Sequence, residues 1–331
     1  MLIHPGQKNK PIFFVIFGIL LLIGLAILFF SNYFFSAPQK ESEPERFIIQ
    51  MGINNSDKIK NDLYEKGFIK NKFGFGIALG CFNCVQEGAY KISKSMSAWE
   101  IAKTIKGDPY MVWVIIKEGY RKEQIGEIFV KEFGWSDEKY DEFIKETNNI
   151  SALDEGIFFP DTYLIPVDES PSDIVKRLYT RFNEKFEPFS KEAINQNIKW
   201  TTLIKIASLV EREAGGEIDM PLVAGILWNR LLQGMKLDID ATIQYARGDK
   251  GDGWWAPISV ADKKINSPYN TYMYKGLPPH PIANPGINAI SAVLYPEKTD
   301  CLYYLHDSSR EIHCAKDYES HKENIEKYLK N

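Results

Sequence analysis

The stretch TTLIKIASLVEREAGG, residues 201–216, holds the most informative pattern in this chain of 331 residues. At about 100° per residue, its apolar side chains form one arc of a helix, with lysine, serine and arginine opposite. Glu213 lies inside the apolar arc, in the last turn before Gly215-Gly216, which should end the helix in the usual glycine manner. Because the carboxyl end of a helix carries partial negative charge, we expect the pKa of Glu213 to be raised.

A carboxylic acid that stays protonated near neutral pH is what the general acid in glycosidic-bond cleavage must be. The helix pattern alone does not decide the role of Glu213, because a solvated glutamate, or one paired with a neighbouring base, shows the same pattern. The hypothesis of a catalytic acid therefore needs support from the rest of the chain.

Two later segments carry groups that suit a sugar ligand. Asp219 is a candidate cap for a second helix, which Gly234 should end and which carries Asn229 near its carboxyl end. The loop SPYNTYMYKGLPPHPIANPG, residues 267–286, is rich in proline and displays tyrosine and asparagine side chains. Such side chains stack on sugar rings and bond their hydroxyl and acetamido groups, although a proline-rich loop can also be simple scaffolding.

An apolar segment near the amino terminus, IFFVIFGILLLIGLAILFF at residues 12–30, contains no charged residue. At about 1.5 Å per residue it covers the roughly 30 Å hydrocarbon core of a bilayer, and it has no polar face. It is longer than the apolar core of a cleavable signal and lacks a small-residue cleavage site, so we expect an uncleaved anchor over residues 12–35 rather than a cleaved signal. Lys8 and Lys10 precede it, which predicts a cytoplasmic tail at residues 1–11 and an extracytoplasmic remainder.

Beyond the anchor, the pattern predicts a polar linker at residues 36–46, a small module and a larger region, with an α+β fold class. In the small module Ser97 can cap a helix, with Glu100 completing a capping box, whereas the glycine-bearing stretch before Cys81 looks like a loop. The expected helices are residues 57–66, 98–106, 123–133 and 173–186, and the expected strands are 86–93, 111–116 and two short ones within 156–166 that Pro160 separates.

Composition limits the classes of function. An aromatic content of 13% excludes a disordered chain. A net charge of −4 with a pI near 5.9 argues against nucleic acid as a partner, because phosphate recognition needs a clustered basic surface. The sequence has neither a glycine-rich phosphate loop nor a cluster with metal-ligand spacing, so we expect no cofactor and no metal.

The four cysteines are too few for a disulfide scaffold. Cys301 and Cys314 bracket an alternating segment that predicts a hairpin turning at Asp307-Ser308, with residue 301 opposite residue 314 and within reach of a cross-strand disulfide. Cys81 and Cys84 form a CxxC motif in a loop-like stretch, which favours a local disulfide or two thiols over a redox site.

Residues 200–296, with EGIFFPDTY at 155–163, resemble the membrane-anchored endolytic murein transglycosylases, the MltG or YceG-like family. The matching motifs occur in the family's order with similar gaps, and the resemblance covers nearly all of the chain beyond the linker. They are the helix ASLVERE, the turn NRL followed by Gly234-Met235-x-Leu237, the pair Asp240-x-Thr242, and the loop YNTY…GLPP-x-PIANPG.

The resemblance implies a single-pass protein of the inner (cytoplasmic) membrane, with a LysM-like subdomain at residues 47–110 and a larger mixed α/β catalytic domain at 111–331. Such enzymes are lyases that cut the β-1,4 bond between N-acetylmuramic acid and N-acetylglucosamine inside peptidoglycan strands. They leave 1,6-anhydromuramyl ends. We expect cleavage by this chain to terminate the elongation of nascent glycan strands. The implied partners are peptidoglycan strands and the cytoplasmic membrane, with peptidoglycan synthases as candidates.

The catalytic glutamate of the family is the second in its E-x-E helix, which corresponds to Glu213. One glutamate suffices, because it can protonate the leaving oxygen and then deprotonate the C6 hydroxyl that captures the muramyl ring. We expect a group of residues to line the cleft or orient Glu213, and so to bind substrate: Glu211, Asn229, Asp240, Thr242, Gln244, Tyr269 and Asn270.

The sequence also departs from the family pattern. Ala241 replaces a proline, His280 replaces a glycine and should narrow the cleft, and Cys314 replaces an aromatic residue. His313 and His321 match family histidines, and we interpret both as structural hydrogen-bonding residues.

Two other functions stay open at this point. Glu211 or Asp240 could supply the second carboxylate of a muramidase, which is a hydrolase. The chain could also be a non-catalytic, membrane-tethered scaffold that binds peptidoglycan and recruits synthases through its small domain.

Overall fold

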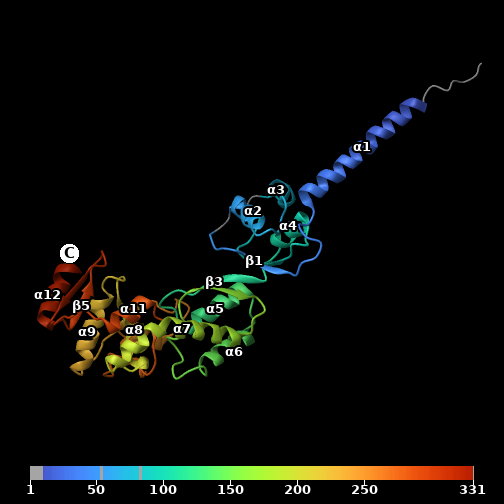
Figure 1. Ribbon diagram of the computed structural model, residues 1–331. Helices are drawn as coiled ribbons and strands as arrows, with labels where there is room; N and C mark the ends of the chain where they lie inside the picture. The colour runs from blue at the N-terminus through green and yellow to red at the C-terminus, as the bar shows by residue number, and fades with distance from the viewer. Residues whose placement is uncertain (1–9, 53–54, 82–83, 331) are drawn as a thin grey trace, which may run out of the picture. The chain divides into compact units, whose positions relative to one another are not determined.

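The computed structural model describes residues 10–52, 55–81 and 84–330. The expected cytoplasmic tail, residues 1–11, lies almost entirely outside the described residues, as does Lys8. The chain is a mixed α/β protein that divides into two compact units (Figure 1). One unit contains the chain up to Trp113 together with Leu164–Asp168, and the other contains Val114–Tyr163 and Glu169 onward.

The first unit is a small antiparallel sheet packed against short helices. Phe47 pairs with Tyr90 between the first two strands, and both side chains are buried in a core that the helices complete. The sheet order is β1-β2-β3-β4. Its elements are α1 (Lys10–Phe35), β1 (Glu45–Ile49), α2 (Ser56–Glu65), α3 (Lys72–Leu79), β2 (Gly88–Ile92) and α4 (Ala98–Lys106). The strands β3 (Met111–Ile115) and β4 (Thr162–Pro166) belong partly to this unit and partly to the other.

Helix α1 is the one described helix that is long and apolar enough to cross a membrane. Its candidate span, Phe13–Phe35, is apolar on every side, and none of its most apolar stretch is buried inside the protein. A helix without a polar face finds no solvent-facing side in water, so it is compatible with a membrane anchor.

Helix α3 occupies residues that the glycine content predicted to be a loop, and that prediction was wrong. The side chain of Asn71 caps the helix by accepting from the Gly74 amide at 2.9 Å, and Gly80 ends it in the left-handed region at φ 66°. A Cβ atom on Gly74 would overlap the carbonyl oxygen of Phe34, so glycine there permits close packing of α3 on α1.

The capping box predicted for the following helix is confirmed. The Ser97 hydroxyl accepts from the Glu100 amide at 3.3 Å, and the Glu100 carboxylate accepts from the Ser97 amide at 2.7 Å. Only one of the two strands expected within residues 156–166 forms, namely β4. The earlier one is absent because the Phe158 amide donates to the side chain of Asn284, at 2.8 Å, instead of to a strand.

The second unit is mainly helical, and α8 lies at its centre, packed against four other helices. The buried face of α8 includes Leu203, Ile206 and Leu209, as the apolar arc predicts. Its elements are α5 (Lys122–Phe133), α6 (Asp137–Thr147), α7 (Pro171–Asn195), α8 (Trp200–Glu213), α9 (Met220–Leu232), α10 (Asp240–Arg247), the 3₁₀ helix η1 (Asp262–Lys264), α11 (Ile287–Leu294), β5 (Tyr303–His306), β6 (Ile312–Ala315) and α12 (Tyr318–Tyr328).

The carboxyl-terminal hairpin forms, but in a different register from the predicted one. Tyr304 pairs with Cys314, so the predicted position of residue 301 opposite residue 314 was wrong. The loop is longer than a two-residue turn because the Asp307 carboxylate accepts from the Ser309 and Glu311 amides, at 2.8 and 3.0 Å. Cys301 still bonds to Cys314 from just outside the strand, and Cys81 bonds to Cys84.

Removal of the hairpin disulfide should destabilise the chain. The double variant Cys301→Ser, Cys314→Ser loses a cross-link that closes a short loop, which is worth about 3 kcal/mol of unfolding free energy. Chemical denaturation of the variant should show this loss, and reduction of the wild-type chain, which also opens Cys81–Cys84, should give a loss at least as large. An unchanged midpoint in both cases would mean that the hairpin is held by its packing alone.

Candidate active site

Helix α8 ends at Glu213 because Ala214 turns to an extended conformation, with φ −66° and ψ 140°. The expected left-handed glycine cap is therefore wrong, since neither glycine that follows has a positive φ. Instead, the amides of Gly215 and Gly216 donate to the Asp219 carboxylate at 2.8 and 3.0 Å.

Asp219 also fixes the carboxyl end of α8 to the hairpin. The Asp219 carboxylate, which accepts from the Gly215 amide, pairs with His306 Nε2 of β5 at 2.6 Å. A Cβ on Gly215 would lie 3.0 Å from the His306 ring, so glycine allows the two backbones to approach. This arrangement brings β5 alongside the carboxyl end of α8.

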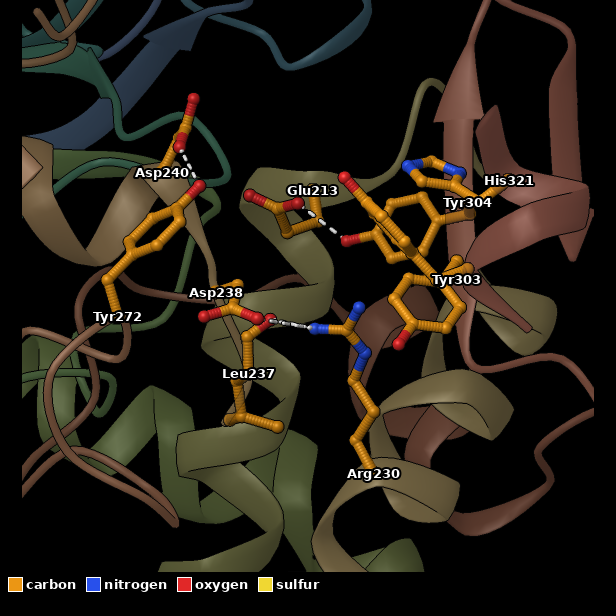
Figure 2. Close-up of a pocket in the computed structure, with 10 residues that line it drawn as sticks. Glu213, Arg230, Leu237, Asp238, Asp240, Tyr272, Tyr303, Tyr304 and His321 are labelled. Atoms are coloured by element: carbon orange, nitrogen blue, oxygen red, sulfur yellow. Dashed lines mark hydrogen bonds and ion pairs between the residues drawn. The ribbon is translucent and has the colours of Figure 1, made fainter. Parts of the chain in front are cut away.

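A cavity of about 640 Å³ opens beside Glu213, between α8, α10 and the carboxyl-terminal hairpin (Figure 2). Five of its ten lining side chains are tyrosine or histidine, which gives it the mixed aromatic and polar character of a sugar site. The lining residues are Glu213, Arg230, Leu237, Asp238, Asp240, Tyr272, Tyr303, Tyr304, Tyr318 and His321.

The environment of Glu213 raises the pKa of its carboxyl group. Burial is the main cause, and the charge of Asp240 adds to it. The Tyr304 hydroxyl, which donates to Glu213 Oε2 at 2.6 Å, lowers the pKa, as do His306 and the Ala241 amide. The direction agrees with the prediction from the sequence, but burial and a second carboxylate replace the helix dipole as the cause.

Neither of the two nearest arginines neutralises Glu213. The Arg212 guanidinium lies over the Trp255 ring at 4.0 Å, on another side of α8. The Arg230 guanidinium lines the cavity, but it donates to the Leu237 carbonyl at 2.7 Å. Figure 2 shows it directed toward Leu237 and Asp238 rather than toward Glu213. The carboxyl group of Glu213 is thus free of a guanidinium partner among the described residues.

Asp240 is the second carboxylate of the cavity, at the first turn of α10. Its Oδ1 atom accepts from the Tyr272 hydroxyl at 2.5 Å, and the Lys263 ammonium lies 3.2 Å away. Burial and this hydrogen bond raise the pKa of Tyr272, which therefore stays a donor. The structure thus brings Asp240 together with Glu213, as the sequence predicted, and adds Tyr272 as its partner.

Thr242 and Asn270 lie behind the cavity rather than on its surface, because both are fully buried. The Thr242 hydroxyl lies 2.9 Å from the Thr271 hydroxyl, which holds the loop of residues 263–273 on α10. Asn270 donates to the Lys263 carbonyl at 3.1 Å and accepts from the Tyr272 amide at 2.9 Å. Their hydrogen bonds therefore position the two partners of Asp240.

The structure places Glu211 and Asn229 outside the cavity. Glu211 accepts from the Gly286 amide at 3.0 Å, at the start of α11, and burial raises its pKa to about 7. Asn229 donates to the Thr299 and Cys301 carbonyls at 2.8 and 3.2 Å. Both side chains hold neighbouring segments against α8 and α9.

Gln244 and Tyr269 also lie away from the cavity. Gln244 donates to the Trp255 carbonyl at 2.9 Å, and the Tyr269 ring packs 4.7 Å from the Tyr245 ring. Burial raises the pKa of Tyr269 to about 12. These residues belong to the packing behind α10.

Of His280, His313 and His321, only His321 lines the cavity. His321 lines the cavity and stacks on Tyr303 at 5.4 Å, whereas His313 stacks on Tyr328 at 3.5 Å. His280 lies 2.7 Å from an oxygen of Asp154 and is not one of the residues that line the cavity.

One group of described residues has donor atoms close enough for a metal ion, namely Asp307, Glu311 and His313. Asp307 already accepts from two loop amides and pairs with His313 at 2.9 Å, so its oxygens serve the hairpin turn. This group lies in the turn and does not line the cavity.

Tyr304, Tyr272 and Arg230 line the cavity, although none of them was predicted as a site residue from the sequence. Tyr272 belongs to the YNTY motif and Arg230 to the NRL turn. Both motifs were recognised, but the site role was assigned to the neighbouring residues Tyr269, Asn270 and Asn229. Tyr303 and Tyr304 are consecutive residues of β5, so their side chains point to opposite faces of the strand. Only the register of the hairpin decides which of the two contacts Glu213.

The comparisons with known proteins agree on one family. A model of the YceG-like family matches residues 47–327. The chain is 31% identical over 300 residues to a protein of Bacillus subtilis named endolytic murein transglycosylase, with 84% of this chain and 80% of that protein covered. It is 27% identical over 313 residues to a protein of the same name from Streptococcus pneumoniae, covering 83% of this chain and 57% of that longer protein.

A solved structure gives the same result. The crystal structure of a yceG-like protein from Listeria monocytogenes superposes with a TM-score of 0.58 and 26% sequence identity. The match covers 86% of this chain and 99% of the Listeria chain.

Proposed function

We propose, from the premise that this chain belongs to the YceG-like family, that it is an endolytic murein transglycosylase, a lyase acting on peptidoglycan. The bond it would cut is the β-1,4 bond between N-acetylmuramic acid and N-acetylglucosamine, with a 1,6-anhydromuramyl end as product. The observation that carries the proposal is a half-buried glutamic acid, hydrogen-bonded to Tyr304 and with a raised pKa, on a cavity lined by aromatic and polar side chains.

In the proposed reaction Glu213 acts first as an acid and then as a base. Its proton passes to the glycosidic oxygen as the bond to C1 of the muramyl ring breaks. The C6 hydroxyl of the same ring then bonds to C1, and its proton returns to the Glu213 carboxylate. No water is consumed, and the glutamic acid is regenerated with its proton.

The contact with Tyr304 assigns different roles to the two oxygens of Glu213. Because the Tyr304 hydroxyl donates to Oε2, the proton of the neutral acid is carried on Oε1. Figure 2 shows that oxygen pointing away from Tyr304. Tyr304 is therefore a positioning residue, which leaves Oε1, on the side of Asp240, to carry the acidic proton.

Asp240 favours a second candidate function, the hydrolysis of the same bond. A muramidase uses a second carboxylate to activate water or to form a covalent intermediate. Here Oδ1 of Asp240 is occupied by Tyr272 and Lys263, which favours an electrostatic role, because its charge raises the pKa of Glu213.

Product mass separates the two reactions. Purified glycan strands treated with the full chain should give products with anhydromuramyl ends, each lighter by one water than the corresponding hydrolysis product. Products with reducing muramic acid ends would instead establish a muramidase.

Two variants should shift the alkaline limb of the pH–rate profile in opposite directions. Burial is the main cause of the raised pKa of Glu213, the Tyr304 hydrogen bond lowers it and the Asp240 charge raises it. Since the protonated acid is the active form, activity declines as the pH rises through this pKa. Tyr304→Phe should move the decline to higher pH and Asp240→Asn should move it to lower pH. Profiles that move the same way would contradict these roles.

We place the active-site unit on the extracytoplasmic side of the cytoplasmic membrane, with the amino terminus in the cytoplasm and α1 as a single-pass anchor. The length and apolar surface of α1 support this proposal. Glycan strands would then be cut close to the synthases that extend them, so that cleavage terminates elongation. A chain that starts at Ser36 should leave longer nascent strands in cells than the full chain does, and equal lengths would argue against a need for the anchor.

The first unit would serve as the LysM-like part of the enzyme and bind glycan strands. Its fold of a small sheet with capped helices supports an independent module. Titration of the full chain with short glycan oligomers, with amide signals of this unit as the readout, would test the proposal. Unshifted signals would limit glycan binding to the cavity beside Glu213.

A further inference from the structure

The first unit exposes a small set of large apolar side chains close to the end of α1. Phe73 and Ile77 stand one turn apart on α3, with 69% and 48% of their surface exposed, and Trp99 on α4 is 51% exposed. Residues four apart lie on the same face of a helix. We refer to Phe73, Ile77 and Trp99 as the apolar patch.

The apolar patch is continuous with the carboxyl end of α1. The Phe73 ring packs on Phe34 with 5.9 Å between centroids, and the Trp99 ring packs on Phe35 at 5.4 Å. Figure 1 shows α3 and α4 beside this end of α1, and the α3 backbone reaches Phe34 at Gly74, where no side chain intervenes. The patch therefore extends the apolar surface of the candidate span sideways.

The connection between α1 and the unit is fixed by hydrogen bonds. The segment expected to be a polar linker, residues 36–46, is bonded to the loop after β2 at Gln39 and Ser42. The Gln39 amide donates to the Lys94 carbonyl at 3.0 Å, and the Ser93 hydroxyl donates to the Ser42 carbonyl at 2.6 Å. The apolar patch consequently keeps its place relative to the end of α1.

Basic side chains accompany the apolar patch. The Lys70 ammonium donates to the Ser36 hydroxyl at 2.9 Å, immediately beyond the end of α1. Lys103 lies one turn from Trp99 on α4, whereas the Lys72 ammonium, next to Phe73 in the chain, donates to Asn61 of α2 at 2.7 Å. The neighbouring Glu100 is engaged in the capping box with Ser97. Aromatic rings beside lysines are the composition that suits the headgroup layer of a membrane with anionic lipids.

We infer that the apolar patch is a membrane-binding surface, which inserts Phe73, Ile77 and Trp99 into the interfacial layer of the bilayer that α1 crosses. The candidate span of 23 residues extends about 34 Å, slightly more than the roughly 30 Å hydrocarbon core, so Phe34 and Phe35 reach the headgroup level. Side chains that pack on these two rings lie at the same depth. The first unit is thereby held against the membrane surface at two places, α1 and the patch, rather than swinging on a tether.

Fluorescence quenching in vesicles tests this inference on the full chain. The chain is reconstituted into vesicles of phosphatidylethanolamine and phosphatidylglycerol, with or without a phospholipid brominated near the ester end of its acyl chains. Bromine quenches nearby tryptophan, and Trp99 is the tryptophan of the apolar patch. The quenched part of the emission should be a minor fraction of the total, since Trp99 is one of 7 tryptophans, and Trp99→Phe should abolish most of it.

Matched variants separate the possible outcomes. Trp113→Phe, in the same unit but bonded to the Ile49 carbonyl, should keep the quenching, whereas the double variant Phe73→Ser, Ile77→Ser should reduce it several-fold. Ile194→Ser removes an even more exposed apolar side chain from the other unit and should change nothing. Quenching that persists in Trp99→Phe, or a wild-type chain that floats with vesicles without quenching, would overturn the inference. A chain that does not float would instead refute the anchor.

Discussion

Glu213→Gln is expected to lower the rate of glycan-strand cleavage by about 10³-fold, the usual contribution of a general acid. Glutamine keeps the shape of the side chain, and the Tyr304 hydroxyl can still donate to its amide oxygen, but the amide has no acidic proton to transfer. Strand binding should persist, because the other lining residues are unchanged. The measurement is the number of anhydromuramyl ends released from purified glycan per unit time, beside the strand affinity of the variant.

Glu217→Gln is the matched control for this variant. Glu217 is exposed and lies four residues beyond Glu213, so its replacement should leave the rate unchanged. If Glu213→Gln kept more than about a tenth of the wild-type rate while the control behaved as expected, Glu213 would not be the general acid. A variant that lost both cleavage and strand binding would point instead to a role of Glu213 in substrate binding.

Asn284→Ala is expected to destabilise the chain by about 4 kcal/mol, because three buried groups lose a partner together. The side chain accepts from the Phe158 amide at 2.8 Å and donates to the Tyr120 carbonyl at 2.9 Å. It also donates to Glu155, at 2.6 Å, and burial raises the pKa of Glu155 to about 8. Denaturant unfolding at neutral pH should show the loss as a lower midpoint.

The control for this variant is Asn288→Ala, which changes the same residue type at an exposed position of α11. Its unfolding midpoint should stay close to that of the wild type. If Asn284→Ala were equally mild, water would have to replace the lost hydrogen bonds, and the side chain would not be what joins residues 155–158 to the loop before α11.

The position of Glu213 was predictable because an amphipathic helix carries its own evidence. The apolar arc of α8 is local, and a carboxylate within the arc stands out against leucine and isoleucine. The capping box of α4 was predictable for the same reason, since Ser97 and Glu100 are close in sequence. Structures that are formed by residues close together in the sequence, such as a helix face or a capping box, can be predicted from the sequence.

The partners of Glu213 and Asp240 were not predictable, because they come from distant segments. Tyr304 reaches Glu213 only in the register set by the Asp307 loop, and a shift of register changes which strand residues face the cavity. Thr242 and Asn270 look like ligand-binding residues in the sequence, yet they bond loop groups behind the cavity. A polar residue type does not reveal whether its partner is a ligand or the backbone.

The most direct test of the account is the protonation state of Glu213 itself. An infrared difference spectrum of the full chain minus Glu213→Gln, recorded at neutral pH, isolates this carboxyl group from the other carboxyl groups of the chain. A protonated Glu213 should give the C=O stretching band of a carboxylic acid in the wild-type spectrum, and the band should be lost as the pH is raised. A difference spectrum with only carboxylate bands at neutral pH would contradict it, because an ionised Glu213 has no proton to give to the leaving oxygen.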